Sequence, residues 1–576
     1  MAKYSGLSLI DMKNYSLPAG NRVDAGLNLR QIYAVLPRNS KGVRFDIYNY
    51  EMLFKDEPTK RIIREGNTIG CFYIESPGMR SLLKKLSVDT FEMLTAASSI
   101  IRPGVAESGM MQEFIARHKD PARRKYLMPE LELHLGETYG VMIYQEDVLK
   151  VAHHIAGLSL EEADLLRRAM SGKMRSQKMM QTLMERFFNS CKEKDLSEEN
   201  SRELWRQIES FAGYAFCKAH SGSFALMSFQ MAYLKAHYPS EFISSVLTNQ
   251  GGFYAPAVYI QEAKRLGLKV LLPSVNESTY EYAGKDDKVQ LGFMAIKNFS
   301  YNSAERIIRA RKQNGPFLSL SDFLIRTSAA YEESALLIKC GAMDCFKKTR
   351  PALMRLLDIY FHRRKILEKG SGDLFIDETI KMEEEIATDT QYSDEEICAI
   401  EYETFGYMLR KHPLEFFTGS SSLKTFAESK SPIILAKDLP KYSGRYIKMM
   451  GWYMTSKRIR TKKGEIMKFL SLEDLTGTFE AILFPKTYMQ YAEYTVSMGP
   501  YLIEGMVDKE GGNNLIVNKL EILSSEKIKL SMQKDSVENN YYGDVETVTE
   551  EEMFISHTLD NEKLQKAYMT STGLAS

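Results

Sequence analysis

The sequence is poor in cysteine, and none of its cysteines is spaced for a zinc site. There is no Cys-x-x-Cys pair and no cysteine–histidine spacing of the zinc-finger kind. This pattern argues against a structural metal and fits the reducing cytosol. The six cysteines are Cys71, Cys191, Cys217, Cys340, Cys345 and Cys398.

Long apolar runs and a large net charge are also missing. No apolar run is long enough to span a bilayer, and the first residues lack the basic start and apolar core of a secretory signal. We therefore expect a cytoplasmic protein without membrane contact. The formal net charge is only +1, so binding of a polyanion must rely on local groups of cations.

What the sequence does contain is a long chain of ordinary apolar content. Its 576 residues, 44% of them apolar, allow several domains, each with its own core. Helical patterns dominate until about residue 440, and strand-like alternation follows. The predicted fold class is multidomain and mainly α, followed by a small β-barrel.

The stretch from Phe211 to Phe242 organises the middle of the chain. Its second half is almost free of charge and has apolar residues at helical spacing, which predicts a mostly buried helix. Lys218 and His220 stand at the mouth of this helix, where a cation and an imidazole suit a polyanion. Alternatively, Lys218 reaches solvent and His220 is a hydrogen-bonded core residue. The predicted buried stripe contains Phe224, Met227, Met231 and Leu234.

Two further groups of cations precede this stretch. A predicted helix ends with Arg167 and Arg168, and Lys173 and Arg175 follow in the next loop. These four cations contact phosphates or, alternatively, complement the dipole at the end of the helix. Arg102, before a Pro-Gly turn, either holds a phosphate or is a solvated arginine.

Two local patterns have structural interpretations. β-Branched and aromatic residues from Thr68 to Glu75 predict a strand. His153 and His154 are adjacent on a predicted helix and point about 100° apart, so they cannot easily ligate one metal ion. We therefore interpret this pair as structural.

Alternation in residues 444–523 predicts a five-stranded barrel of the oligonucleotide-binding (OB) type. Between Arg445 and Lys468 there are eight basic residues and one acidic residue, Glu465. The aromatic residues among them are Tyr446, Trp452, Tyr453 and Phe469, and some of these rings must belong to the core. Cations with stacking rings suit single-stranded nucleic acid. The predicted DNA contacts are Lys457, Arg458, Arg460, Lys462 and Lys463.

Residues 291–311 have a helix–turn–helix pattern, and residues 336–346 look like the turn of a second such unit. Paired short helices grip a sugar–phosphate backbone through N–H groups at the turn, and Lys297 is the predicted contact. Residues 371–403 contain twelve acidic residues and one basic residue, which predicts a mobile connector. Leu374 and Phe375 form a small apolar patch there that could dock on a partner.

Four stretches of the chain, in order, resemble the alpha subunit of bacterial DNA polymerase III, a C-family DNA polymerase. They are most similar to its error-prone paralogue, and the resemblance extends from about residue 26 to about residue 525. One of them reads ETYGVMIYQEDVLKVAHHIAGLSLEEADLLRRAMSGK. The four stretches are Gly70–Leu86, Ala97–Met111, Glu137–Lys173 and Phe211–Phe242.

The resemblance implies a domain organisation. Its parts would be an unpatterned start with a remnant of the palm edge (1–60), the polymerase fingers (61–284), tandem helix-hairpin-helix motifs (285–350), a helical and acidic connector (351–439), the OB-fold (440–525) and a C-terminal tail (526–576).

The resemblance also implies site residues. In the family, the cations of a Leu-Arg-Arg-Ala-Met motif and a Tyr-x-Phe-x-Lys-x-His motif line the site of the incoming deoxynucleoside triphosphate (dNTP). The matching residues are Arg167, Arg168, Tyr214, Lys218 and His220. Primer-template DNA would contact Arg102, Lys173, Arg175, Lys297 and the cations of the barrel. Leu374 and Phe375 would be candidates for contact with the sliding clamp.

The sequence departs from the family at the catalytic centre. Family members hold two magnesium ions with three palm aspartates, and two of these, like the PHP domain, would precede this chain. We therefore expect an N-terminally truncated chain. It is either a truncated product or half of a split subunit that requires a separate palm and PHP polypeptide. The third aspartate aligns near Gly20, which cannot bind a metal, so Asp24 is the remaining candidate. Mg²⁺ is thus expected for the family and no metal site for this chain alone. A smaller departure is Asn298-Phe299-Ser300 in place of a glycine-rich hairpin turn.

Two functions follow from these observations. The first is the C-terminal portion of a polymerase that binds primer-template DNA and dNTP for template-directed synthesis in replication or error-prone repair. The second is a catalytically silent DNA-binding paralogue without the palm metal site. Retention of Arg167, Arg168, Lys218 and His220 favours the first, and the missing carboxylates favour the second. Whether this chain alone is an enzyme stays open.

Overall fold

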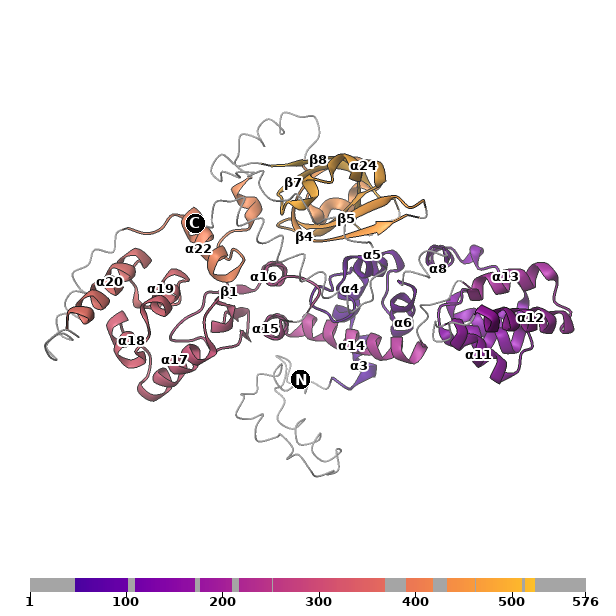
Figure 1. Cartoon of the computed structure of the whole chain (residues 1–576), viewed down its shortest axis with the longest axis horizontal. Coiled ribbons are helices and arrows are strands. Elements are labelled where there is room, and N and C mark those ends of the chain that lie inside the picture. Colours follow the sequence, from indigo (N-terminus) through magenta and orange to yellow (C-terminus); the bar gives the residue numbers. More distant parts are fainter. Residues whose placement is uncertain are drawn as a thin grey trace, which may run out of the picture. The chain divides into compact units, whose positions relative to one another are not determined.

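A computed structural model describes residues 47–101, 109–170, 177–209, 217–250, 252–367, 390–417, 433–461, 463–509 and 513–523 (Figure 1). The chain divides into two compact units, the first beginning at Asp46 and the second at Tyr238. The first unit is helical, and the second adds a small sheet and a closed barrel to its helices. The predicted class, mainly α followed by a small β-barrel, is confirmed. Among the described helices, none is long and apolar enough to cross a membrane.

The first unit consists of short helices, several of which begin at a capping side chain. Its elements are α3 (Tyr50–Lys55), α4 (Glu57–Arg64), α5 (Pro77–Leu86), α6 (Phe91–Ile100), α8 (Met110–Lys119), η2 (Pro121–Arg123), α9 (Pro129–Leu135), η3 (Gly136–Thr138), α10 (Gln145–Lys150), the π-helical turn η4 (Val151–Ile155), α11 (Leu160–Met170), α12 (Gln177–Glu193), α13 (Glu198–Glu209) and α14 (Lys218–His237). Asp56, Ser76 and Thr90 each accept a backbone N–H in the first turn of the helix that follows.

Helix α14 spans 20 residues and packs against α3, α4 and α6. The predicted helix is present, but of the four residues in the predicted stripe only Leu234 is buried. Met227 is 41% exposed, whereas the small residue Ala225 is fully buried. Small side chains let α14 approach α6 closely, and the hydroxyl of Ser99 donates to that of Ser221 at 2.7 Å. Apolar spacing alone therefore identified the helix and not the side that faces the core.

Residues Thr68 to Glu75 form turns, so the predicted strand is wrong. Side chains take the place of a strand ladder in satisfying the backbone here. The buried ammonium of Lys235 on α14 donates to the carbonyl oxygens of Asn67 and Ile69 at 2.7 and 2.8 Å. Strand propensity reports how well a residue fits a pleated surface, and tertiary contacts override it at this loop.

The second unit begins with two helices and a small sheet, and four more α-helices follow. Its sheet has the order β1-β3-β2, with β1 parallel and β2 antiparallel to β3. The hairpin turns predicted near residues 298 and 341 hold Asn298 and Gly341 at positive φ, 60° and 85°. Asparagine tolerates this left-handed conformation better than most residues with a side chain. The elements are α15 (Pro239–Asn249), α16 (Pro256–Arg265), β1 (Lys269–Leu271), β2 (Ala283–Lys285), β3 (Lys288–Gln290), η5 (Phe293–Ala295), α17 (Tyr301–Asn314), α18 (Leu320–Thr327), α19 (Tyr331–Lys339), η6 (Asp344–Phe346) and α20 (Arg350–Leu367).

The acidic segment predicted to be a mobile connector contains helix α22 (Asp394–Phe405). Ser393 and Glu396 form a capping box at its start. The buried carboxylate of Glu401 accepts the backbone N–H groups of Leu409 and Arg410 at 2.6 and 2.8 Å. This part of the segment is a packed helix, which corrects the prediction. Residues 368–389 lie outside the described residues.

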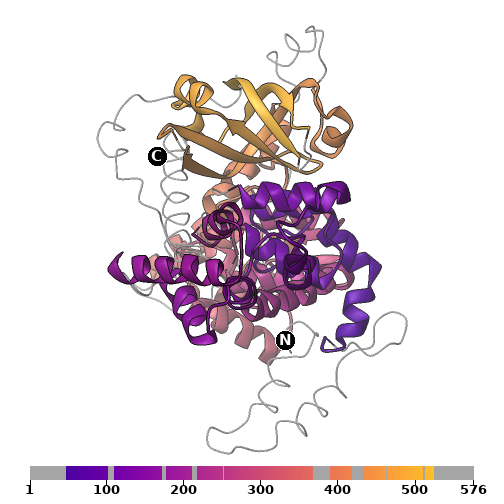
Figure 2. The same ribbon diagram turned by 90° about the vertical axis from the view of Figure 1, so that its right-hand side faces the viewer.

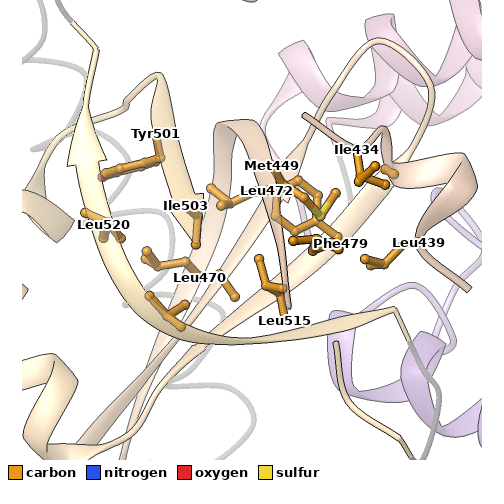
Figure 3. Packing of buried hydrophobic residues seen from close by; sticks show 14 of the residues in the cluster. Ile434, Leu439, Met449, Leu470, Leu472, Phe479, Tyr501, Ile503, Leu515 and Leu520 are labelled. Carbon is orange, nitrogen blue, oxygen red and sulfur yellow. The ribbon is translucent and has the colours of Figure 1, made fainter. Parts of the chain in front are cut away.

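The barrel predicted from alternation is confirmed, and its strands close in the order β4-β5-β6-β8-β7. Neighbouring strands are antiparallel except β6 and β8, which are parallel. Figure 2 shows the barrel from a second side. Buried side chains such as Met449, Leu472, Phe479 and Leu515 point toward one another inside it (Figure 3). Its elements are η7 (Pro413–Phe416), η8 (Ala436–Tyr442), β4 (Tyr446–Arg460), β5 (Ile466–Glu473), β6 (Thr478–Leu483), α24 (Pro485–Tyr491), η9 (Tyr494–Val496), β7 (Tyr501–Val507) and β8 (Asn514–Ile522).

A buried ionic cluster joins helix α16 to strand β5 within the second unit. Arg265 donates to Glu473 at 2.8 Å and to Glu262 at 3.0 Å. Nε2 of His412 lies 3.7 Å from the carboxylate of Glu473, and both side chains are buried. Burial opposes ionisation, but Arg265 and His412 hold the pKa of Glu473 below its ordinary value. The carboxylate is therefore charged and compensated at neutral pH.

Arg265→Ala should destabilise the second unit by about 3–5 kcal/mol, because it leaves a buried carboxylate without its main partner. Urea unfolding followed by the fluorescence of Trp452, in a Trp205→Phe background, measures this. Lys441→Ala removes an exposed ion pair with Asp438 and should cost at most about 1 kcal/mol. The contribution of Glu473 should also fade as the pH falls below the ordinary pKa of glutamate. Equal effects of the two variants would contradict a buried, compensated cluster.

Candidate nucleotide and DNA interface

Helix α10 brings two of the predicted cations together in the first unit. Arg167 on α11 donates from Nη1 to Oε1 of Gln145 at 2.8 Å. The next residue, Glu146, accepts the backbone N–H of Lys218 at 2.9 Å. Because Lys218 is the first residue of α14, adjacent residues of α10 hold both Arg167 and the N-terminus of α14.

Lys218 is an ion-paired cation at this helix N-terminus. Its ammonium donates to both carboxylate oxygens of Glu137 at 2.7 and 2.8 Å. Each of the two side chains is 46% exposed, so the pair is open to water. The ring of Tyr144 lies 5.5 Å from the ammonium. Lys218 is therefore neither free in solvent nor buried. Its ion pair is partly exposed, so water and competing anions can reach it.

Arg167 and Arg168 share the carboxylate of Asp164. The nitrogen–oxygen distances are 2.8 Å for Arg167 and 2.7 Å for Arg168. The hydrogen bond from Arg167 and the charges of both arginines lower the pKa of Asp164. Each predicted phosphate-binding cation among the described residues of this unit is therefore paired with a carboxylate.

A buried carboxylate, Asp147, shapes the turn that leads into α10. One of its oxygens accepts the backbone N–H groups of Ile143 and Tyr144, both at 2.9 Å. The other lies 3.7 Å from the ammonium of Lys150 and has no hydrogen-bond partner among the described residues. Burial raises the pKa of Asp147 to about 6. The turn into α10 thus depends on the carboxyl group of Asp147, whose ionisation is opposed by burial.

His220 is exposed, which excludes the alternative of a core histidine. Its ring stands edge-on to Phe224, with centroids 4.4 Å apart and planes at 90°. His153 and His154 have structural contacts: Nδ1 of His153 lies 2.7 Å from the carbonyl oxygen of Leu158. The ring of His154 stacks on His134 at 4.4 Å.

Four of the DNA contacts predicted for the barrel are described, and they lie in the hairpin formed by β4 and β5. Lys457, Arg458, Arg460 and Lys463 are all exposed there. Lys457 is the cross-strand partner of Phe469, so a cation and a partly exposed ring share one face. Tyr446 is also exposed, whereas Tyr453 is buried in the core and Trp452 packs against α22 residues. The expectation that only some of these rings can stack on bases agrees with this division.

Lys297, the predicted contact of the first hairpin, is held by helix α22. Its backbone N–H donates to the carbonyl of Thr404 at 2.8 Å. Its ammonium donates to the carbonyl of Tyr402 at 3.4 Å and lies 5.7 Å from that ring. Burial lowers the pKa of Lys297. A role in DNA binding would require this ammonium to leave its contacts.

The other predicted site residues lie outside the described residues, and their roles stay predictions. They are Asp24, Arg102, Lys173, Arg175, Tyr214, Leu374, Phe375 and Lys462.

The described residues do not fit the two-magnesium centre expected for the family. Within them, no group of three or more His, Cys, Asp or Glu side chains could hold a metal ion. The carboxylates nearest the cations are Glu137, Glu146 and Asp164, and each is engaged by a cation or a backbone N–H. Sequence reasoning missed these partners and Gln145, although all four lie within the quoted stretch from Glu137 to Lys173. Asp164 is three and four residues from the arginines that it binds, whereas Gln145, Glu146 and Glu137 are far along the chain from their partners.

Comparison with known proteins gives this geometry a context. A family model for the "Bacterial DNA polymerase III alpha subunit finger domain" matches residues 29–195. A model for a "Helix-hairpin-helix motif" matches residues 267–353. "DNA polymerase III subunit alpha" of Staphylococcus aureus (strain MRSA252) is 32% identical over 530 residues, covering 89% of this chain and 47% of the relative. The Staphylococcus epidermidis protein of that name is 31% identical over 522 residues, with 89% and 47% covered. The chain therefore spans about half the length of the curated relatives it matches.

Helical fingers, helix-hairpin-helix motifs and a closed OB-type barrel define a class of polymerase-related proteins. The particular similarity is to DNA polymerase III alpha subunits, through the finger model over residues 29–195 and the staphylococcal relatives.

Asp147→Asn should change how stability depends on pH. The pKa of Asp147 rises from 3.8 to about 6 on folding, so wild-type stability falls as the pH increases between these values. Asparagine can still accept the two N–H groups and does not ionise. Relative to wild type, the variant should gain up to about 3 kcal/mol as the pH rises from about 4 to about 7. Urea unfolding at several pH values measures this, and a difference independent of pH would contradict the assignment.

Proposed function

We propose that this chain binds primer-template DNA and an incoming dNTP for template-directed DNA synthesis, in replication or error-prone repair. The observation that carries the proposal is the joint anchoring of Arg167 and Lys218 by adjacent residues of α10. A triphosphate needs several cations at fixed spacing, and this arrangement holds two of them beside a helix N-terminus. The match of residues 29–195 to polymerase fingers supports the same function.

The carboxylates of Glu137 and Asp164 act as exchangeable partners of these cations. An exposed ion pair contributes at most about 1 kcal/mol, so a ligand of higher charge can displace the carboxylate. A triphosphate entering the site would take Lys218 from Glu137 and the arginines from Asp164. Before that exchange the pairs keep the cations in place at little cost in free energy. His220 and Tyr214 would then contact the sugar or base.

The DNA would be held through regions that do not read its sequence. Hairpin turns in residues 267–353 offer backbone N–H groups to phosphates. The cations and exposed rings of the β4–β5 hairpin suit the single-stranded template. Contact of Leu374 and Phe375 with a sliding clamp, and of the chain with a palm and PHP polypeptide, complete the proposal. The magnesium ions expected for the family would be held by groups other than the described residues.

Glu137→Gln should strengthen dNTP binding, up to about fivefold, because it removes the competitor for Lys218. Lys218→Ala should weaken it at least about tenfold, because a charge-assisted hydrogen bond to phosphate is lost. Titration of a fluorescent dNTP with the full chain on a recessed primer-template measures both. Glu203→Gln is the matched control, since Glu203 pairs with Arg206 at a similarly exposed position elsewhere in the unit. Weaker binding by Glu137→Gln would show that Glu137 only supports the fold.

Primer extension distinguishes an enzyme from a catalytically silent DNA-binding paralogue. With Mg²⁺ and four dNTPs, extension that Asp24→Ala abolishes would show catalysis through Asp24. Adding a polypeptide with the family's palm and PHP domains tests whether activity requires a partner. DNA and dNTP binding without extension in either case would favour the silent paralogue. Absence of both kinds of binding would overturn the proposed function.

A further inference from the structure

We propose that four aromatic residues of the first unit form a stacking site for an unpaired base of a DNA strand. The group, called here the aromatic platform, consists of Phe72, Tyr73, Phe224 and His220. The inference rests on the proposed function, since it places the platform beside the candidate triphosphate site. It assigns a role to the loop that sequence reasoning interpreted as a strand.

Phe224 is the centre of the platform and contacts the other three rings. Its centroid lies 4.7 Å from that of Tyr73, with planes inclined by 17°. The centroids of Phe72 and His220 lie 5.5 and 4.4 Å away. Phe72 is 42% exposed, and His220 is exposed as well. A core cluster would bury such rings, whereas this one leaves aromatic surface open to solvent.

The loop that carries Phe72 and Tyr73 is fastened to α14 by side-chain hydrogen bonds. Lys235 binds the carbonyls of Asn67 and Ile69, and the hydroxyl of Ser228 donates to the carbonyl of Phe72 at 3.0 Å. Glu75 accepts the backbone N–H of Gly70 at 2.7 Å. The same helix thus supplies Phe224 and His220 and positions the two rings of the loop. A site fastened in this way loses little conformational freedom when a ligand binds.

Tyr73 is in the left-handed region, with φ of 68°. This conformation is costly for a bulky residue and is found where surrounding contacts enforce it, often at functional sites. Here it directs the tyrosine ring against Phe224. The strain is therefore associated with the assembly of the platform.

The neighbouring charge favours a nucleic acid as the occupant. Lys218 and His220 both lie in the first turn of α14, so the cation and the stacking surface are at the same end of this helix. Single-stranded DNA offers alternating bases and phosphates, and proteins that bind it combine rings with cations. An apolar peptide would leave the cations unused. The unpaired template strand next to the nucleotide site has the chemistry that both parts require.

The test compares two primer-templates whose single-stranded overhangs carry either normal bases or abasic residues. Both have the same phosphates, so the ratio of their dissociation constants isolates the contribution of the bases. Phe72→Ala in the full chain should reduce the preference for the base-containing overhang at least about fivefold. Phe72→Trp retains a stacking ring and should keep the preference. Fluorescence anisotropy at constant salt measures all the constants.

Tyr50→Ala is the matched control, because Tyr50 is an aromatic residue of the same unit with 41% exposure. It should leave the preference unchanged. An equal loss for both overhangs in Phe72→Ala, or an intact preference, would overturn the platform. Loss of dNTP binding with an intact preference would overturn the assignment to a DNA strand. A wild-type chain that binds neither overhang would instead refute the proposed function.

Discussion

In the first unit the buried ammonium of Lys235 holds the loop that follows α4 against helix α14. An ammonium removed from water is costly unless it is hydrogen-bonded, and here the carbonyls of Asn67 and Ile69 supply the bonds. Those carbonyls belong to a loop that has no strand partner of its own. The ammonium and the carbonyls therefore satisfy each other's need for a hydrogen bond. This exchange fixes the loop on α14, the helix whose first residue, Lys218, belongs to the candidate nucleotide site.

The cations of that site are held by the fold before any ligand arrives. Glu146 fixes the backbone at Lys218, Glu137 holds its ammonium, and Gln145 holds Arg167. A bare group of cations would repel itself and bind any polyanion, whereas paired cations yield only to a ligand of higher charge. Local pairing of this kind is compatible with a net charge of only +1, because a site can present cations to a ligand without an excess of positive charge in the chain.

Local patterns in the sequence predicted helices and strands well, but they predicted buried faces and long-range contacts poorly. The barrel strands and helix α14 follow from spacing alone, because alternation and helical periodicity are local. The buried face of α14 did not follow, since Ala225 and Ser221 face the core by virtue of their small size. The partners of Lys218 are 72 and 81 residues away in the chain, so no local pattern could pair them. Residues 68–75 were misread because strand propensity was overruled by a lysine far along the chain.

The two predicted DNA-contacting regions differ in whether their cations are paired with carboxylates, and this difference separates their proposed roles. In the first unit each described candidate cation is matched by a carboxylate, which suits a ligand that must be selected and then released. In the barrel, Lys457, Arg458 and Arg460 project from a hairpin beside a partly exposed ring. Exposed cations bind phosphates without selection and in a salt-dependent way. A polymerase requires both behaviours, since its template must slide while each nucleotide must be chosen. In the proposed function, the pairing of Lys218 with Glu137 is thus the feature that would distinguish a nucleotide site from a simple DNA-binding surface.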